Sequence, residues 1–302
     1  MSQRVRGLLI VGLILSIGLP ATAVAQQALV WKFAPGDVFF VEETVNQEQS
    51  VTIGDRTETK KTRQTTIMQY QVADVNPDGE VDLEITIKSI LDDGEKSNDV
   101  TRRIAGSKFG LTLDNKGQLI RFDGYANFVK RVANGNIQFE RLFQSVLSEK
   151  TLQQTMVQLL TSLPGTNVSR GQSWQQKQTL NVGPFGTLAV DRTFEHKGLM
   201  NGDDGTFVDV GLMGTAKYAL PDPDKSRLPF KISQGELIVD RFQGSGSFDM
   251  QRQRMRSLDV ELHVMGKLTI SVGPQKADLT IDQTQTSRLR VLDSLPRTRG
   301  PR

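Results

Sequence analysis

Cysteine is absent from this chain of 302 residues, and histidine occurs only twice, as His196 and His263. The lack of cysteine excludes disulfide bonds, thiolate metal sites and thiol catalysis, and also a lipid attached through an N-terminal cysteine. Small domains with thin cores usually need disulfides or metals. We therefore expect this chain to rely on one large hydrophobic core.

Several motifs with known chemistry are also missing. The sequence has no phosphate-binding P-loop, dinucleotide fingerprint, nucleophile elbow or zinc-protease helix. It therefore predicts no catalytic residue, no cofactor and no metal site. Paired carboxylates can hydrolyse glycosidic bonds, and acids are common in this chain, so residue type alone leaves that class of enzyme open.

The N-terminus has the layout of a secretory signal. Met1–Arg6 carries two arginines and no acid, Leu8–Leu19 is an apolar run, and Ala23-Val24-Ala25 offers small residues to a signal peptidase. We expect a signal peptide over residues 1–25 that is cleaved between Ala25 and Gln26. The alternative is an uncleaved membrane anchor, because the apolar stretch approaches the roughly 17–25 residues that span a bilayer. Cleavage would leave no stable membrane span and would export the protein to the periplasm or the medium.

The net charge is small once the signal is removed. The whole chain has a formal charge of +3, and the loss of Arg4 and Arg6 takes it to +1. A nearly neutral protein gives no general electrostatic attraction to nucleic acid. We expect no nucleic-acid partner.

Period-two alternation dominates the rest of the chain. Apolar and polar residues alternate around Val81–Ile87, Val208–Leu212, Leu258–Val264 and Leu279–Ile281. Such strands have one buried and one solvated face. Turn sequences such as Asn76-Pro77-Asp78-Gly79 separate the runs. The pattern predicts a mainly β fold with a large curved antiparallel sheet, resembling half of a barrel.

The central segment breaks the alternation. From Ile137 to Leu163 the apolar residues fall at helical spacing, and Pro164-Gly165 ends the pattern. We predict two short helices or one kinked helix over residues 137–163, and an earlier helix over Tyr125–Ala133. This helical insertion should cover one face of the sheet. It serves either as a lid over an apolar cavity or simply as the second layer that a one-sided sheet needs.

Short matches suggest an internal repeat. Gly36-Asp37-Val38-Phe39 resembles Gly171-Gln172-Ser173-Trp174. We expect residues 26–294 to form a single domain, in which residues 28–135 and 166–292 form two related halves joined by the helices. Residues 295–302 are proline-bearing and basic, which predicts a disordered tail.

Five features were weighed as sites. His196 lacks an evident acid to orient it as a base, whereas His263 and Glu261 share a strand face and could supply two metal ligands. The turns Asp114-Asn115-Lys116-Gly117 and 201–205 lack the spacing of calcium loops. Arg252, Arg254 and Arg256 form a row that suits either a polyanion or solvated edge charges. We favour a structural role for all of these features.

The stretch Leu29-Val30-Trp31-Lys32-Phe33-Ala34-Pro35-Gly36-Asp37 after the signal resembles the start of an uncharacterised family of exported bacterial proteins, of the planctomycete type. Gly171-Gln172-Ser173-Trp174 and Leu113-Asp114-Asn115-Lys116-Gly117 fit the same pattern. The resemblance implies no known activity. The expected layout is also similar to periplasmic lipoprotein-carrier folds, which wrap a curved antiparallel sheet around helices.

These observations favour a non-catalytic binding or cell-envelope interaction module, with an apolar ligand or an envelope component as its partner. A hydrolase of envelope polymers that uses paired carboxylates is the alternative, and a purely structural surface protein is a third reading. An apolar ligand requires a cavity between sheet and helices, whereas a hydrolase requires two converging acids.

Overall fold

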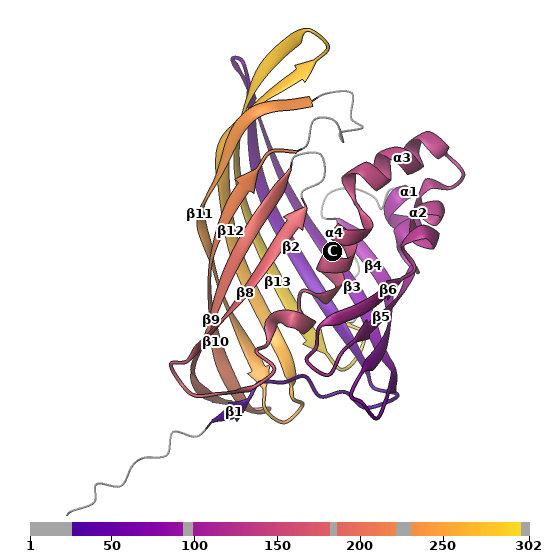
Figure 1. The fold of residues 1–302 in the computed structure, drawn as a ribbon, viewed down its shortest axis with the longest axis vertical. Coiled ribbons are helices and arrows are strands. Elements are labelled where there is room, and N and C mark those ends of the chain that lie inside the picture. The colour runs from indigo at the N-terminus through magenta and orange to yellow at the C-terminus, as the bar shows by residue number, and fades with distance from the viewer. Residues whose placement is uncertain (1–25, 93–98, 182–185, 222–230, 297–302) are drawn as a thin grey trace, which may run out of the picture.

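Antiparallel strands that never close into a full barrel make up most of the molecule (Figure 1). The structure is a computed structural model and describes residues 26–92, 99–181, 186–221 and 231–296. The expected signal peptide with its cleavage point, and residues 297–302 of the expected tail, lie outside the described residues. Within the described residues, one sheet has eleven strands, in the order β6-β5-β4-β3-β2-β13-β12-β11-β10-β9-β8.

The strands of this sheet follow one another along the chain, with β2 and β13 paired at its centre. Their bounds are β2 (Val38–Ile53), β3 (Arg56–Val75), β4 (Val81–Asp92), β5 (Lys108–Leu113), β6 (Leu119–Asp123), β8 (Ser173–Asn181), β9 (Thr187–Gly202), β10 (Gly205–Ala219), β11 (Lys231–Asp249), β12 (Arg254–Val272) and β13 (Gln275–Leu292). A short second sheet pairs β1 (Gln27–Ala28) with β7 (Asn167–Val168).

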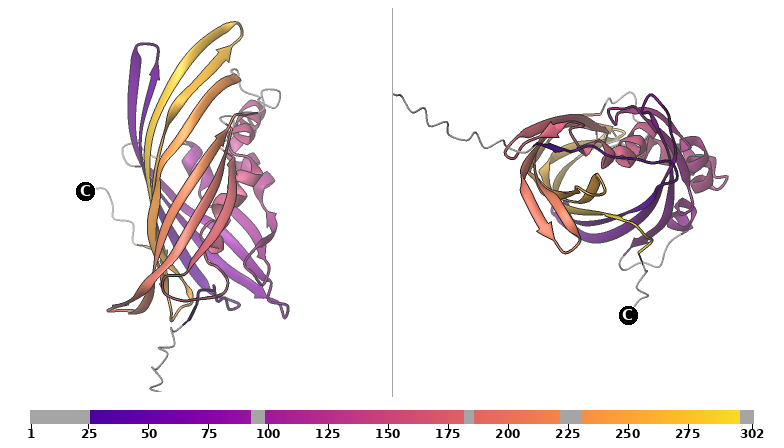
Figure 2. Two further views of the ribbon diagram at one scale, coloured as in Figure 1. Left: turned by 60° about the vertical axis from the view of Figure 1, so that its left-hand side comes forward. Right: turned by 90° about the horizontal axis from the view of Figure 1, so that it is seen from below.

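Helices lie between the two edge strands of the large sheet. They are α1 (Asp99–Ile104), α2 (Tyr125–Ala133), α3 (Ile137–Val146) and α4 (Glu149–Val157), followed by the 3-10 turn η1 (Leu160–Ser162). Seen from below, the strands curl into an incomplete ring and the helices lie along its side (Figure 2). We call residues 125–163, from α2 to the end of η1, the helical cover.

The predicted fold class is therefore confirmed. The sheet is large, curved and antiparallel, and the helices stand in the middle of the chain, with α2 at the residues expected. The segment predicted over residues 137–163 contains α3, α4 and η1. Helix α1 was not predicted, because its six residues are too few to show a helical period.

Alternation along the strands explains how the core forms. On β4, Val81, Leu83, Ile85 and Ile87 are buried, whereas the residues between them are more exposed. The buried faces of the other strands point the same way, so the sheet has an apolar concave side. The helical cover adds Leu152, Met156, Val157, Leu159 and Leu160 to this core.

Aromatic rings attach the first two helices of the cover to the sheet. The ring of Phe128 on α2 lies 5.4 Å from that of Phe109 on β5 and 5.6 Å from that of Phe143 on α3, in both cases edge to face. Such geometry is favourable for aromatic pairs. The rings therefore form a continuous chain from strand β5 to helix α3.

Two corners of the fold share the same contacts. The backbone N–H of Gly36 donates to Val72 at 2.9 Å, and that of Gly171 donates to His196 at 2.7 Å. In each case the accepting residue donates back to the residue after the glycine, at 2.8 and 3.0 Å. Both glycines have positive φ, 88° and 83°. These matched corners support the expected duplication, which stays a prediction.

The junction from β6 to α2 depends on Gly124, which has a φ of 103°. A Cβ atom there would lie 2.6 Å from the carbonyl oxygen of Lys108. Gly117 also has positive φ, 75°, but a Cβ atom there meets nothing within 4 Å. Substitution of Gly117 would therefore introduce backbone strain alone, whereas substitution of Gly124 would introduce backbone strain and a steric overlap.

We expect Gly124→Ala to lower the free energy of unfolding by about 2–4 kcal/mol, because strain and overlap add. Gly117→Ala should cost only about 1–2 kcal/mol, because strain acts alone. Urea denaturation of both variants measures the difference. Equal losses of unfolding free energy in the two variants would contradict this, because they would show that the overlap with the Lys108 carbonyl costs nothing.

Candidate functional site

A cavity of about 170 Å³ lies on the concave side of the sheet, beneath α4 and the residues that follow it. Its lining comes from seven strands, β2, β3 and β9 to β13, and from the helical cover. The apolar members are Val41, Met68, Leu159, Leu188, Val190, Ala216, Val239, Phe242, Leu258, Val260, Leu262 and Leu289. The polar members are Glu43, Tyr70, Thr155, Gln158, Gln285 and Ser287. An apolar chamber with a few polar groups is the usual form of a small-molecule site.

Small residues on the inner face shape one wall of the cavity. A Cβ atom on Gly214 would lie 2.6 Å from the ring of Phe242, so only glycine lets this ring lie against β10. Ala216, two residues further along the same strand, also lines the cavity. Because neither residue has a large side chain, space remains between β10 and the helical cover.

Glu43 is the one carboxylate among the described residues that line the cavity. It follows Phe39 and Val41 on the inner face of β2, at a position where the alternation calls for an apolar residue. The hydroxyl of Ser287 donates to its Oε1 at 3.0 Å. Burial raises the pKa of Glu43 above its usual range, and the bond from Ser287 partly opposes this shift.

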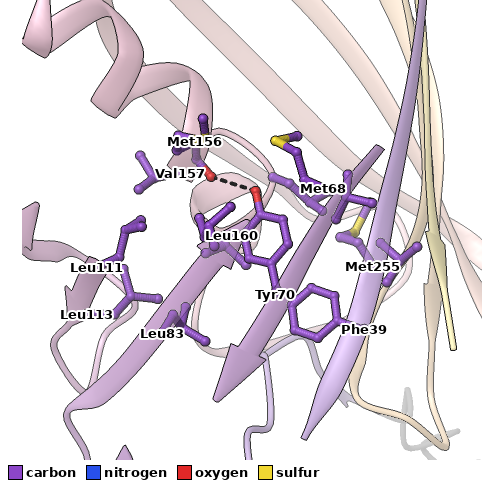
Figure 3. Close-up of a cluster of buried hydrophobic side chains, with 14 of the residues drawn as sticks. Phe39, Met68, Tyr70, Leu83, Leu111, Leu113, Met156, Val157, Leu160 and Met255 are labelled. Atoms are coloured by element: carbon purple, nitrogen blue, oxygen red, sulfur yellow. Dashed lines mark hydrogen bonds between the residues drawn. The ribbon is translucent and has the colours of Figure 1, made fainter. Parts of the chain in front are cut away.

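Tyr70 connects the wall of the cavity to its cover (Figure 3). Its hydroxyl donates to the carbonyl oxygen of Met156 on α4 at 3.1 Å, and its ring stacks on Phe39 with 5.0 Å between centroids. Burial, and then the charge of Glu43, raise the pKa of Tyr70. The hydroxyl therefore stays protonated as a donor to α4.

Further hydrogen bonds attach the helical cover to the edge strand β8. Gln154 Nε2 donates to the carbonyl of Thr179 at 2.6 Å, and Trp174 Nε1 donates to the carbonyl of Ser162 at 3.1 Å. In both bonds a side chain donates to a backbone carbonyl on the other element. The cover is thus fixed along the β8 edge as well as at Tyr70.

Arg192 is buried on the inner face of β9, close to this attachment. Its Nη2 donates to Gln178 Oε1 at 2.6 Å, while its Nε has no partner among the described residues. Burial lowers the pKa of Arg192, but a guanidinium stays protonated in proteins. Arg192 does not belong to the lining of the cavity.

A larger hollow, of about 800 Å³, lies on the outer face of the sheet. Its lining has four acids and four bases, and two ion pairs lie within it. Lys197 contacts Glu195 at 2.6 Å, and Arg288 contacts Asp259 at 2.8 Å. Exposed pairs of this kind contribute little to stability and leave no excess charge for a ligand. The hollow therefore has the character of a solvated sheet surface.

His196, the first histidine weighed from the sequence, is buried in the core. Its Nε2 lies 2.8 Å from Gln27 Oε1, and its Nδ1 has no partner among the described residues. No acid within hydrogen-bonding distance orients it in the described part of the chain. This environment suits a structural role that connects β1 to β9.

His263, the second histidine, lies between two carboxylates on the outer face. Its Nδ1 is 2.5 Å from Asp240 Oδ1 on β11, and its Nε2 is 3.0 Å from Asp282 Oδ1 on β13. Glu261, its expected partner in a metal site, pairs with Arg241 instead. The described residues contain no group of three or more potential ligands that could hold a metal ion.

The arginine row is neutralised by acids. Arg252 and Arg254 both pair with Asp293, and Arg256 pairs with Asp204 at 3.3 Å while lying over the ring of Phe207. These contacts support the reading of the row as surface charges of a sheet end. They leave no free row of cations for a polyanion.

The two turns that resemble calcium loops connect neighbouring strands. Asp114 Oδ1 accepts the backbone N–H groups of Lys116 and Gln118, at 2.9 and 2.7 Å, and so closes the turn between β5 and β6. The second turn joins β9 to β10 between Gly202 and Gly205. Both are hairpin turns.

The sequence did not single out Glu43 or Tyr70. A signal for Glu43 was present, because it is a charge on the apolar face of a strand. No comparable signal existed for Tyr70, since its partner Met156 is distant in the chain. In the described part of the chain, no helix combines the length and apolar character that a membrane crossing requires.

Fold and cavity together define an open antiparallel half-barrel with a helical cover. Residues 63–202 match the model of a "Family of unknown function (DUF6263)", a span that runs from within β3 to the end of β9. This match supports a relationship to an uncharacterised family and brings no activity with it. No curated protein matches the chain.

The solved structures that match include two proteins of Pseudomonas aeruginosa. OccK5 (OpdH) is 10% identical, with 86% of this chain and 99% of that chain covered and a TM-score of 0.21. The outer membrane protein OprG is 8% identical, with 89% and 100% covered and a TM-score of 0.15. Scores this low carry no argument about fold or function.

The surroundings of His263 give a prediction about pH. Hydrogen bonds that His263 donates to the carboxylates of Asp282 and Asp240 raise its pKa above the ordinary value of 6.5. The stabilisation is therefore complete below pH 6.5 and is lost as the pH rises through the raised pKa. We expect His263→Gln to remove up to about 1 kcal/mol at pH 6 and less at pH 9. Urea denaturation at both pH values measures this, and a loss that is independent of pH would contradict it.

Proposed function

We propose that this protein is a non-catalytic binding protein that holds an apolar ligand between its sheet and its helical cover. The observation that carries the proposal is the cavity beneath α4. Twelve of its lining residues are apolar, and they come from both the sheet and the cover. Closed apolar cavities of about 150 Å³ are known to take up benzene-sized molecules.

The size of the cavity limits what it can hold. At about 170 Å³ it accommodates one ring or a short alkyl group, whereas drug-sized ligands occupy about 300–1,000 Å³. Movement of α4 away from the sheet would make room for a longer chain. The cover is attached by a few hydrogen bonds and apolar contacts, so it can open locally without unfolding the sheet.

Two sequence-based expectations fit this proposal. A curved antiparallel sheet wrapped around helices is the layout of lipoprotein-carrier folds, which is an analogy of architecture and not of function. The expected signal peptide would deliver the protein to the periplasm or the medium, where envelope lipids would be available as ligands. Both points support the proposal without testing it.

A paired-carboxylate hydrolase finds less support. Such an enzyme needs two acids about 5–10 Å apart on either side of the substrate. Among the described lining residues the cavity offers only Glu43, and its neighbour Glu42 lies on the outer face of β2. The geometry therefore favours binding over hydrolysis.

Toluene tests the proposal because it is apolar, uncharged and small enough for the cavity. We expect saturation-transfer NMR to detect its binding to the wild-type protein. Ala216→Leu should weaken binding at least about fivefold, because the added isobutyl group fills the chamber. Ala189→Leu places the same group on the exposed face of β9 and serves as the matched control.

Circular dichroism melts should show that both leucine variants are folded. Loss of toluene binding in the Ala216 variant alone places the ligand beneath α4. Failure of the wild-type protein to bind toluene, or equal binding by both variants, would contradict the proposal.

A further inference from the structure

The charge of the cavity depends on one group. Its ionisable lining residues in the described part of the chain are Glu43 and Tyr70, and no lysine, arginine or histidine belongs to the lining. The Tyr70 hydroxyl already donates to Met156. Glu43 is therefore the group that determines which ligand charge the cavity accepts.

The carboxyl of Glu43 has unused capacity to accept hydrogen bonds. An ionised carboxylate offers about four lone-pair sites, and the structure fills one of them with the Ser287 hydroxyl. Glu43 lines the cavity together with Val41, Tyr70 and Leu289, none of which is a cation. A half-buried carboxylate with one neutral hydrogen-bond donor is only partly compensated for its lost hydration.

We propose that the ligand of this cavity is an apolar molecule bearing one amine, whose ammonium group pairs with the Glu43 carboxylate. The inference rests on the proposed function and adds the chemical class of the ligand. An ammonium supplies up to three donors and a full positive charge, which are the features that the lining lacks. The apolar remainder of the ligand occupies the space among the leucine and valine side chains.

An anionic ligand fits the same chamber less well. A second negative charge beside Glu43 would be repelled, and no lining cation offsets it. Arg192 is the buried cation nearest in sequence to the lining residue Val190, but its Nη2 is already engaged by Gln178. The pKa of Glu43 is raised by burial, which the hydrogen bond from Ser287 only partly opposes, and this agrees with a carboxyl that would gain from a cation.

Three probes of equal size isolate the effect of charge. Benzylamine, benzyl alcohol and benzoate share one ring and differ in the attached group, and each approaches the volume of the cavity. We expect isothermal titration calorimetry at pH 8 to show that benzylamine binds at least about tenfold more tightly than benzyl alcohol, as a charge-assisted hydrogen bond predicts. Benzoate should bind more weakly than the alcohol.

Two glutamine variants identify the group responsible. Glu43→Gln keeps the shape of the side chain and should reduce benzylamine binding to the level of the alcohol. Glu42→Gln changes the neighbouring acid on the outer face and should leave binding unchanged. Thermal melts of both variants show whether each is folded. Alcohol binding that persists in Glu43→Gln shows that its cavity is intact.

The outcomes separate this inference from the proposed function. Equal binding of amine and alcohol, tighter binding of benzoate, or no effect of Glu43→Gln on benzylamine would overturn the amine assignment while the cavity still binds toluene. Failure of every probe, including toluene, would remove the proposed function together with it.

Discussion

The sheet of this protein does not close, and the rest of the structure depends on that constraint. Strands β6 and β8 are the two ends of the eleven-stranded order and do not pair with each other. The concave side between them is lined with apolar residues that require a second layer. Eight buried core side chains of the helical cover, three on α2 and five from Leu152 to Leu160, supply it, and each large one contributes about 1.5–3 kcal/mol.

Short helices cover only part of the concave side of a curved sheet. They therefore leave an internal space that a closed ring of paired strands would not have. Helix α4 has nine residues, whereas the strands beneath it have up to twenty. The main core continues below α4, and a separate small cluster of Ile232, Leu268 and Leu279 lies near the far ends of the strands. The cavity with Glu43 adjoins the main core, because Val41, Met68 and Tyr70 belong to both. The β2–β3 and β12–β13 hairpins extend well beyond the helices (Figure 1).

Local sequence patterns predicted much of this architecture. The alternation of apolar and polar residues predicted the apolar faces of β4, β10 and β12. The helical spacing of apolar residues predicted α2 and the helical segment over residues 137–163. These features depend on residues close together in the chain. The short helix α1 has too few residues to show a period, and it was missed for that reason.

The candidate site depended on contacts that no local pattern encodes. Glu43 meets Ser287 across the central strand pairing, and Tyr70 meets Met156 only after the cover folds back. The two acids beside His263 come from strands on either side of its own. Register between distant strands determines these contacts, so the sequence could supply the residues but not their partners.

Hydrogen exchange of α4 tests most directly whether the cover is held over the cavity as described. In Tyr70→Phe the carbonyl of Met156 loses its buried donor, at a cost of about 1–3 kcal/mol. The account predicts that backbone amides of α4 exchange at least about fivefold faster in this variant, while those of α2, which is held by Phe109 and Phe143, keep their wild-type rates. Unchanged exchange in α4, or an equal acceleration in both helices, would contradict it.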